Sequence, residues 1–229
     1  MRTTRDASRR FWDRAALSNP AWYIATGHTS ETDDFFRQGA EETDALLALC
    51  GIGLQRHETT LEIGCGVGRM TRRLSQLAER VIAVDVSAEM LRRCEANLDG
   101  TSNVEHQLVP GDGSMSAIPD ESVDLVFSYI TLQHVPSRRA QLTYLRESVR
   151  VLKPGGRMAI QVRDCSLRGR ALDWSGHLAH AVARRHTLSS SWRGARLPDS
   201  AIRRTLEPLG VEVSIMRHLR HRWVLGTKP

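Results

Sequence analysis

Hydrophobic and polar positions alternate along most of the chain in a regular rhythm. From about residue 58, short apolar runs take turns with stretches in which apolar residues recur at helical spacing. This rhythm predicts strands joined by crossover helices, as in a doubly wound α/β domain. The expected strands are Thr59 to Ile63, Val81 to Asp85, Val104 to Leu108, Val123 to Tyr129 and Arg157 to Val162. The expected helices are Arg69 to Ala78, Ala88 to Asn97, and Arg138 to Leu152, the last capped by Ser137 and stopped by Lys153-Pro154-Gly155-Gly156.

The C-terminal part predicts one more helix and two more strands. Pro198-Asp199-Ser200 begins a helical pattern that runs to Pro208-Leu209-Gly210, and Val211 to Ile215 and Trp223 to Thr227 then alternate as strands. The prediction is a seven-stranded, mostly parallel sheet within a core of residues 54–229. Two segments lie outside this pattern, an N-terminal helical region at residues 1–53 and an insertion after the fifth strand at about residues 164–198.

Composition adds few constraints. The 229 residues, 41% of them hydrophobic, suit one globular domain. The formal charge is +6, but the arginines are scattered in short doublets, as on solvated helix surfaces, so charge does not indicate nucleic acid. The N-terminal stretch lacks the apolar run of a secretory signal, and no segment has the length of a membrane span. We therefore expect a soluble, cytoplasmic protein.

Four cysteines are present without metal-ligand or disulfide spacing. Cys50, Cys65, Cys94 and Cys165 lie far apart, and none belongs to a Cys-x-x-Cys pair. Free buried thiols in a reducing compartment are the expectation.

The strongest chemical signal follows the first predicted strand, in LEIGCGVGRMTRRL at residues 61–74. Gly64, Gly66 and Gly68 recur every second residue, which permits a tight turn and lets a ligand touch the backbone. A dinucleotide site needs Gly-x-Gly-x-x-Gly, but Arg69 stands three residues after Gly66. The spacing argues against NAD and allows a smaller cationic cofactor, which Glu62 is placed to face.

The run from Glu62 to Gly68 resembles the first motif of class I S-adenosylmethionine-dependent methyltransferases, of a small-molecule, bacterial-looking type. Further resemblance covers about residues 55–165, including SVDLVFSYITLQHV and LKPGGRMAIQV. It implies the Rossmann-like methyltransferase fold, S-adenosylmethionine as cofactor and S-adenosylhomocysteine as product. The implied cofactor-binding residues are Glu62, Gly64, Cys65, Gly66, Gly68, Asp85, Val86, Met90, Asp112, Gly113 and Tyr129.

Three of these residues have individual roles by resemblance. Asp85 would accept hydrogen bonds from the ribose hydroxyls, Met90 would lie against adenine, and Asp112 would accept from the adenine amino group. Met90 is almost equally consistent with an ordinary core position, and Asp112 with a turn.

His134, directly beyond the fourth predicted strand, is the candidate for general base. Its ordinary pKa suits proton transfer at neutral pH, although a histidine here also suits packing or hydrogen bonding near the methionine end of the cofactor. Tyr129 and Gln133 are candidates for orienting the acceptor. A base is needed only for acceptors that must lose a proton.

The acceptor is expected to be a small organic molecule with an O, N or C nucleophile, for instance in secondary metabolism. In the resembled family the segments outside the core often cover the substrate, and here they carry the aromatic residues Trp12, Trp22, Tyr23, Trp174 and His177. The same residues would equally serve to hold helices on the sheet.

Metal and nucleic-acid chemistry are not expected. Ser128-Tyr129-Ile130-Thr131 departs from the motif of the DNA amino-methylating branch, and Asp164 alone cannot supply the carboxylate set of the magnesium-dependent members. No metal is predicted, nucleic acid is an unlikely partner, and the chain is expected to be a monomer or homodimer. Alternatives are an RNA methyltransferase or a non-methylating cofactor-binding protein on the same fold.

Overall fold

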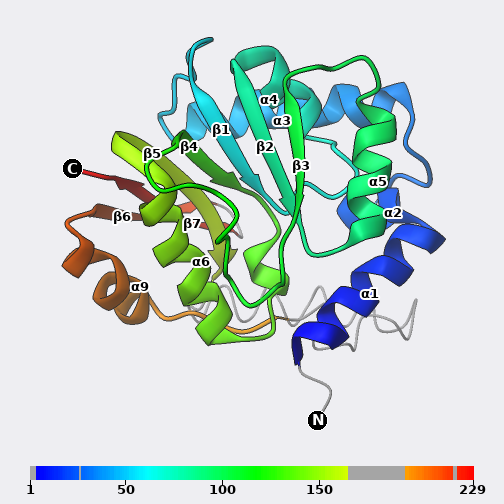
Figure 1. Cartoon of the computed structure of the whole chain (residues 1–229). Helices are drawn as coiled ribbons and strands as arrows, with labels where there is room; N and C mark the ends of the chain where they lie inside the picture. Colours follow the sequence, from blue (N-terminus) through cyan, green and yellow to red (C-terminus); the bar gives the residue numbers. More distant parts are fainter. Residues whose placement is uncertain (1–3, 26, 165–193, 219–220) are drawn as a thin grey trace.

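The computed structural model describes residues 4–25, 27–164, 194–218 and 221–229. Its centre is a seven-stranded sheet with the order β3-β2-β1-β4-β5-β7-β6 (Figure 1). The strands are β1 Thr59–Ile63, β2 Arg80–Asp85, β3 Val104–Leu108, β4 Val123–Ser128, β5 Leu152–Arg163, β6 Glu212–His218 and β7 His221–Thr227. β1 to β5 run parallel, and β7 lies antiparallel between β5 and β6. The predicted seven-stranded, mostly parallel sheet is confirmed.

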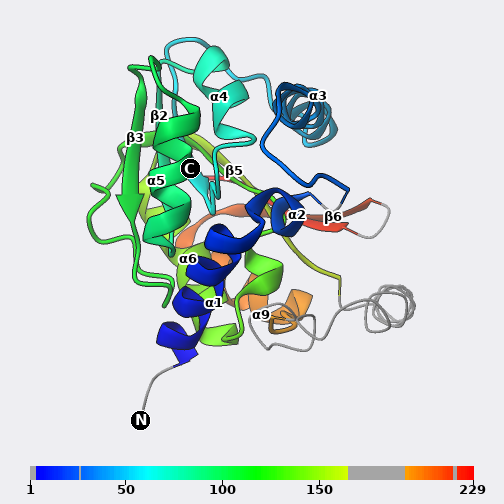
Figure 2. The same ribbon diagram turned by 90° about the vertical axis from the view of Figure 1, so that its right-hand side faces the viewer.

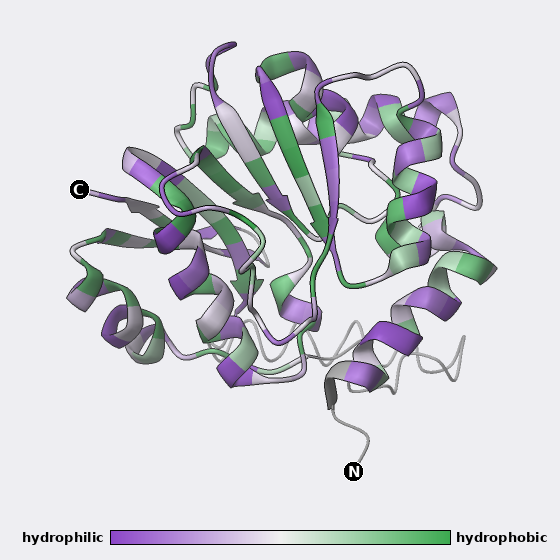
Figure 3. Cartoon of the chain, viewed as in Figure 1, coloured by the Kyte–Doolittle hydropathy of each residue, from purple (hydrophilic) through white to green (hydrophobic). Residues whose placement is uncertain are grey.

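Helices cover both faces of the sheet. α3 (Asp33–Leu49), α4 (Thr71–Leu77) and α5 (Ala88–Asn97) lie on one face, and α6 (Arg138–Val151) and α9 (Asp199–Leu206) lie on the other. Two short 3-10 turns follow β4 and α9, η1 at Leu132–His134 and η3 at Glu207–Leu209. Figure 3 shows apolar residues concentrated along the strands and polar residues on the outer sides of the helices, as a doubly wound domain requires.

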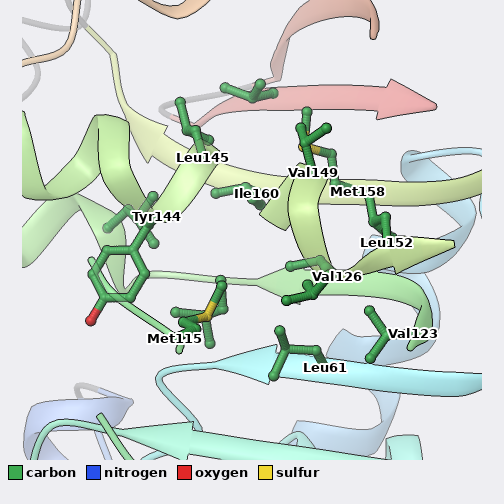
Figure 4. Close-up of a cluster of buried hydrophobic side chains, with 14 of the residues drawn as sticks. Leu61, Met115, Val123, Val126, Tyr144, Leu145, Val149, Leu152, Met158 and Ile160 are labelled. Carbon is green, nitrogen blue, oxygen red and sulfur yellow. The ribbon is translucent and has the colours of Figure 1, made fainter. Parts of the chain in front are cut away.

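Side chains alternate between two cores because successive residues of a strand point to opposite faces. Leu61, Val126 and Ile160 point toward α6, where they meet Leu145 and Val149 (Figure 4). On the opposite face, a second cluster joins residues of β4, β7, α3 and α4, namely Phe127, Trp223, Leu47 and Leu74. Both cores hold the strands rigidly, and this fixes where their carboxyl ends lie.

The N-terminal helices divide between two tasks. α3 belongs to the sheet-covering layer, since Leu47 and the following Ile52 are buried beside Trp223. α1 (Thr4–Ser18) and α2 (Pro20–Ile24) instead lie across the carboxyl ends of the strands, as Figure 2 shows. Residues 1–53, which the sequence groups as one region, thus contribute both to the core and to a cover over the sheet edge.

Several element boundaries differ from the predicted ones for identifiable reasons. α4 begins at Thr71, not Arg69, because Arg69 and Met70 still belong to the turn that continues from Gly68, whose φ is +88°. The predicted turn at Lys153-Pro154-Gly155-Gly156 lies inside β5 as a bulge: Leu152 pairs with Val123, while Arg157 pairs with Leu125.

The C-terminal hairpin is longer than the hydrophobic pattern indicates. β6 and β7 continue pairing through Arg217 with Arg222 and His218 with His221. Polar side chains are tolerated on β6 because it is the edge strand, and the buried Arg222 of β7 pairs with Asp199, so apolar alternation underestimates the length of both strands. The Ser137 cap of α6 is as predicted, since its side chain accepts a hydrogen bond from the Ala140 amide.

Candidate cofactor and acceptor site

A cleft opens at the carboxyl edge of the sheet, where ligands of open parallel sheets collect. Counted with its open mouth and the solvent in it, it holds about 840 Å³ of empty space. Its walls come from the ends of β1, β2 and β4 with the turns that follow them, from η1 and the loop after β3, from α5 and α6, and from α1 and α2 above. The lining residues are Ser8, Trp12, Tyr23, Ile24, Ile63, Gly64, Cys65, Gly66, Val84, Asp85, Val86, Met90, Val109, Gly111, Tyr129, Ile130, Thr131, His134, Val135 and Tyr144.

The glycine loop lies close to its neighbours and has left-handed backbone. Gly64 has φ +81°, and a Cβ there would lie 2.2 Å from the Thr131 side chain. Gly66 has φ +55°, and a Cβ would lie 2.8 Å from Cδ1 of Ile24 in α2. Only glycine meets both demands without strain, so the loop's backbone borders the cleft directly.

Asp85, the last residue of β2, connects the glycine loop to α5. One carboxylate oxygen accepts a hydrogen bond from the backbone amide of Gly66 at 3.1 Å, and the other accepts one from the backbone amide of Ser87 at 2.9 Å. Burial raises the pKa of Asp85 to about 6, although both hydrogen bonds favour the charged form. A carboxylate offers about four acceptor positions, so Asp85 can still accept a hydrogen bond from a ligand in the cleft.

Met90 and Val109 form an apolar wall beside Asp85. Met90 is 2% exposed, and its amide donates to Oγ of Ser87, the cap of α5. The Ser87 hydroxyl in turn donates to Asp13 of α1 at 2.6 Å. This bond ties the covering helix to the end of β2.

The comparisons with known proteins agree on one family. A methyltransferase-domain model matches residues 61–160. A probable methyltransferase, LtbC of Aspergillus luteorubrus, is 31% identical over 68% of this chain and 59% of its own length. Trans-aconitate 2-methyltransferase of Rhodopseudomonas palustris strain BisB18 is 28% identical over 76% of this chain and 62% of its own length. The solved DhpI-SAM-HEP complex superposes with a TM-score of 0.64 at 25% identity, covering 98% of this chain and 97% of that one.

The chain belongs to the class I S-adenosylmethionine-dependent methyltransferases. It spans about three fifths of the length of the two curated relatives named above. The resemblance in the glycine loop therefore predicted the family correctly.

The structure brings ten of the residues expected from the sequence to the cleft. They are Trp12, Tyr23, Gly64, Cys65, Gly66, Asp85, Val86, Met90, Tyr129 and His134. They come from α1, α2, α5, η1 and the ends of β1, β2 and β4 with the turns that follow them, so they meet only in the folded chain.

Other expected residues lie behind or beside the cleft. Gly68 is not part of its wall; a Cβ there would meet Sγ of Cys94 at 2.9 Å, so this glycine allows α5 to approach the loop. Asp112 is exposed and accepts the Ser114 amide, while Gly113 abuts α6, where a Cβ would lie 2.4 Å from the Ala140 carbonyl oxygen. In this loop Gly111 lines the cleft instead.

Glu62 lies under the loop and borders a second hollow beside the main cleft. Its side chain is buried and accepts the Thr71 hydroxyl at 2.6 Å. Burial raises the pKa of Glu62 to about 8. The second hollow shares Gly64 and Cys65 with the main cleft and also reaches Arg69, whose guanidinium pairs with Glu42 at 2.5 Å.

The cysteine thiols among the described residues are free. Cys65 and Cys94 are buried and Cys50 is half-buried. Burial raises the pKa of the Cys50 thiol to about 12. Cys165 lies outside the described residues.

The far end of the cleft is aromatic. The His134 imidazole, 7% exposed, meets the Trp12 indole edge to face with ring centroids 5.6 Å apart. Tyr129 stacks on Trp223 at 5.7 Å, and its hydroxyl lies 3.4 Å from Nε2 of His221. Gln133 lies behind His134, outside the lining of the cleft.

Trp22, a further expected substrate residue, is not in the cleft wall. It contacts Tyr23 with ring centroids 5.0 Å apart. Trp174 and His177 lie outside the described residues.

The sequence did not single out several lining residues, most of all Ile24, Ile130 and Thr131. Ile130 has φ +53°, a strained value for a β-branched residue, and its amide donates to Oε1 of Gln161 at 3.1 Å. No local pattern marks such a position. Thr131 has a clearer signal, since it lies three residues after the end of β4 and therefore at the same sheet edge as Gly64.

The described residues contain neither a membrane-spanning helix nor a cluster that could hold a metal. Within the described ranges, no helix is long and apolar enough to cross a bilayer. In the same ranges no three or more His, Cys, Asp or Glu side chains gather closely enough to hold a metal ion. Asp164 lies 3.7 Å from Nε of Arg217 in an ion pair.

Proposed function

We propose that this chain binds S-adenosylmethionine in the cleft and transfers its methyl group to a small organic acceptor, leaving S-adenosylhomocysteine. The supporting observation is the continuity of the cleft. It runs from the glycine loop and Asp85 to an aromatic compartment around Trp12 and His134. We call the part at Gly64, Gly66, Asp85 and Met90 the cofactor end.

The residues present fit the cofactor. The glycines let a ligand reach the loop backbone, the Asp85 carboxylate has lone pairs for a vicinal diol, and Met90 offers a polarizable apolar surface for an aromatic ring. Among the described lining residues there is no Lys or Arg, so no cationic side chain in this wall repels a sulfonium.

We call the part of the cleft at Trp12, Tyr23, His134 and Val135 the acceptor end. When bound, S-adenosylmethionine supplies a methyl group activated by its sulfonium. The chain contributes alignment and exclusion of water, which supply much of the acceleration in a direct displacement. α1 and α2 cover this end, and Trp12 and Tyr23 line its wall.

A small acceptor suits this compartment better than a polymer. The acceptor end lies beneath the covering helices and is walled largely by aromatic and aliphatic side chains. Trans-aconitate 2-methyltransferase, among the relatives, is named for a small-molecule acceptor. We place the acceptor against Trp12 and His134, with Tyr129 at the junction of the two ends.

The direct test is methyl transfer with labelled cofactor. The chain is incubated with S-adenosylmethionine labelled in its methyl group and with a panel of small phenols, carboxylates and amines. We expect mass spectrometry to find one labelled methyl group in a small molecule. We expect His134→Ala to lower turnover far more than it lowers affinity for S-adenosylhomocysteine. Label that enters RNA but no small molecule would contradict the proposal.

A further inference from the structure

Two glutamines behind the acceptor end form a hydrogen-bond chain that ends on His134. Gln161 lies on β5 and is fully buried, and Gln133 lies in the η1 turn after β4. Gln161 Nε2 donates to Gln133 Oε1 at 3.0 Å, and Gln133 Nε2 lies 3.2 Å from Nε2 of His134. The direction of every bond in this chain can be deduced.

Two backbone groups fix the orientation of the Gln161 side-chain amide. The Ile130 N–H can only donate, so the atom 3.1 Å from it must be Oε1 of Gln161. The Val162 carbonyl can only accept, so the atom 3.0 Å from it must be Nε2. Both assignments agree, and the reversed amide would place donor against donor and acceptor against acceptor.

The orientation of Gln161 determines that of Gln133. Because Gln161 presents an N–H, Gln133 must accept it through Oε1. Its amide nitrogen is then the atom that faces His134, and an amide N–H₂ only donates. Nε2 of His134 must therefore accept this bond, which requires a lone pair on Nε2 and leaves the proton of the neutral ring on Nδ1.

We propose that Gln161, acting through Gln133, holds His134 in the Nδ1–H tautomer. Gln161 and Gln133 are positioning residues for His134. A proton on Nε2 would point at the Gln133 amide donor, so the chain disfavours both the other tautomer and the imidazolium. His134 then orients the acceptor by its ring, and it does not take a proton through Nε2. This role of His134 rests on the proposed function, whereas the tautomer itself does not.

The prediction runs against the intrinsic preference of histidine, whose neutral side chain in water favours Nε2–H. One net hydrogen bond shifts an equilibrium by roughly tenfold. We therefore expect the population ratio of the two tautomers to favour Nδ1–H in the folded chain.

The experiment reads the tautomer without substrate or cofactor. The full chain is labelled with ¹⁵N-histidine, and two-bond ¹H–¹⁵N correlation spectra identify which ring nitrogen carries the proton; the His134→Asn spectrum assigns the signal. We expect a protonated Nδ1 and an unprotonated Nε2. A protonated Nε2 in the wild-type chain overturns the proposal.

A substitution that reverses the last bond sharpens the test. Gln133→Glu replaces the donor by a carboxylate, which accepts from His134, so the proton should move to Nε2. Gln76→Glu makes the same chemical change on an exposed residue of α4 and should leave the His134 signal unchanged. An Nε2 that stays unprotonated in the Gln133→Glu variant contradicts the proposal.

Gln161→Met tests the first member of the chain. Losing its donor frees Gln133 to rotate, so we expect a mixture of both tautomers at His134. If this buried substitution prevents folding, Gln133→Met breaks the same chain from a half-buried position. An undisturbed Nδ1–H tautomer in both folded variants would overturn the role of the glutamines. Failure of methyl transfer with the expected tautomer intact would instead refute the proposed function alone.

Discussion

The cofactor end and the acceptor end of the cleft are built in different ways. The cofactor end is built from two short segments, Gly64 to Gly68 and Asp85 to Met90. Within the second segment, the residues that face the ligand are held by hydrogen bonds between near neighbours in the sequence. The acceptor end is assembled from α1, α2, η1 and β5, and its side chains are held by partners far away in the sequence. The first is therefore recognisable from local motifs, and the second depends on the complete fold.

The difference has a physical consequence for tolerance to change. At the cofactor end a single Cβ blocks the ligand, because the backbone itself is the wall. At the acceptor end a side chain is the wall, so a substitution alters shape and orientation while the pocket beneath it persists. Substitutions at the two ends should therefore separate cofactor affinity from methyl transfer.

The largest effect is expected from Gly64→Ala. The new Cβ would lie 2.2 Å from the Thr131 side chain at φ +81°, so the loop or Thr131 must move into the cleft. We expect affinity for S-adenosylhomocysteine, measured by calorimetry, to fall by about 100-fold or more, equivalent to roughly 3 kcal/mol.

Gly51→Ala is the matched control for that variant. Gly51 also has positive φ, +68°, but a Cβ there meets nothing within 4 Å. It should carry only the backbone cost of about 1–2 kcal/mol in stability and leave cofactor affinity unchanged. Equal losses of affinity in both variants would show that the effect is not local to the cleft.

Asp85→Asn should weaken the cofactor next most strongly. The amide nitrogen of Asn cannot accept the hydrogen bond that one carboxylate oxygen now accepts from the backbone N–H of Gly66 or Ser87. The Asn side chain also offers fewer lone pairs to a ribose diol. We expect a loss of about 10- to 100-fold in affinity for S-adenosylmethionine and its product. The control is Asp124→Asn, which should not alter this affinity, because Asp124 lies near the amino end of β4, at the edge of the sheet away from the cleft. Unchanged affinity in Asp85→Asn would contradict the placement of Asp85 at the cofactor end.

Trp12→Ala should impair methyl transfer at the acceptor end while leaving cofactor affinity at the other end nearly unchanged. It removes the ring that contacts His134, so kcat/KM for the methyl acceptor should fall by about tenfold or more. Affinity for S-adenosylhomocysteine should change by less than about threefold, since Trp12 is placed at the acceptor end. Trp22→Ala, outside the lining, is the control and should leave methyl transfer intact; equal effects of the two substitutions would contradict this placement.

The smallest expected effect concerns Glu62 and pH. Its pKa in the folded chain is about 8, above the ordinary 4.5, so the folded state holds the proton more tightly. The associated stabilisation is complete below about pH 4.5 and is lost as the pH rises through about 8. Glu62→Gln removes this dependence, and between pH 7 and 9 the wild-type Tm should fall by about 3 °C more than that of the variant.

That pH window isolates Glu62 from the other buried carboxyl of the site. Asp85, with a pKa of about 6, completes most of its own ionisation below pH 7. Parallel Tm curves for wild type and Glu62→Gln across pH 7 to 9 would show that Glu62 ionises normally.

The same contrast explains how much the sequence predicted. The sheet followed from apolar periodicity, because β1, β2 and β4 are buried on both faces and read as apolar runs. Gly64, Gly66 and Asp85 followed from residue types at fixed spacing. In Pro110-Gly111-Asp112-Gly113 the letters mark a turn but not which residue faces inward, and the structure turns Gly111, not Asp112, to the cleft.

The rest depends on contacts that no local pattern encodes. Ile24 lies over Gly66 only because α2 crosses the sheet edge, and Gln161 reaches Gln133 across 28 residues of sequence. The left-handed backbone of Ile130 opposes its own residue preference and is held by the Gln161 side chain. Such positions are set by tertiary structure, so they emerge only after folding.

The most direct test of the account is calorimetric titration of the wild-type chain with S-adenosylmethionine and with S-adenosylhomocysteine. The account predicts one site per chain for each ligand, competition between the two, and loss of both signals in Gly64→Ala but not in Gly51→Ala. Absence of binding for both ligands, in protein whose circular dichroism spectrum shows it to be folded, would contradict it.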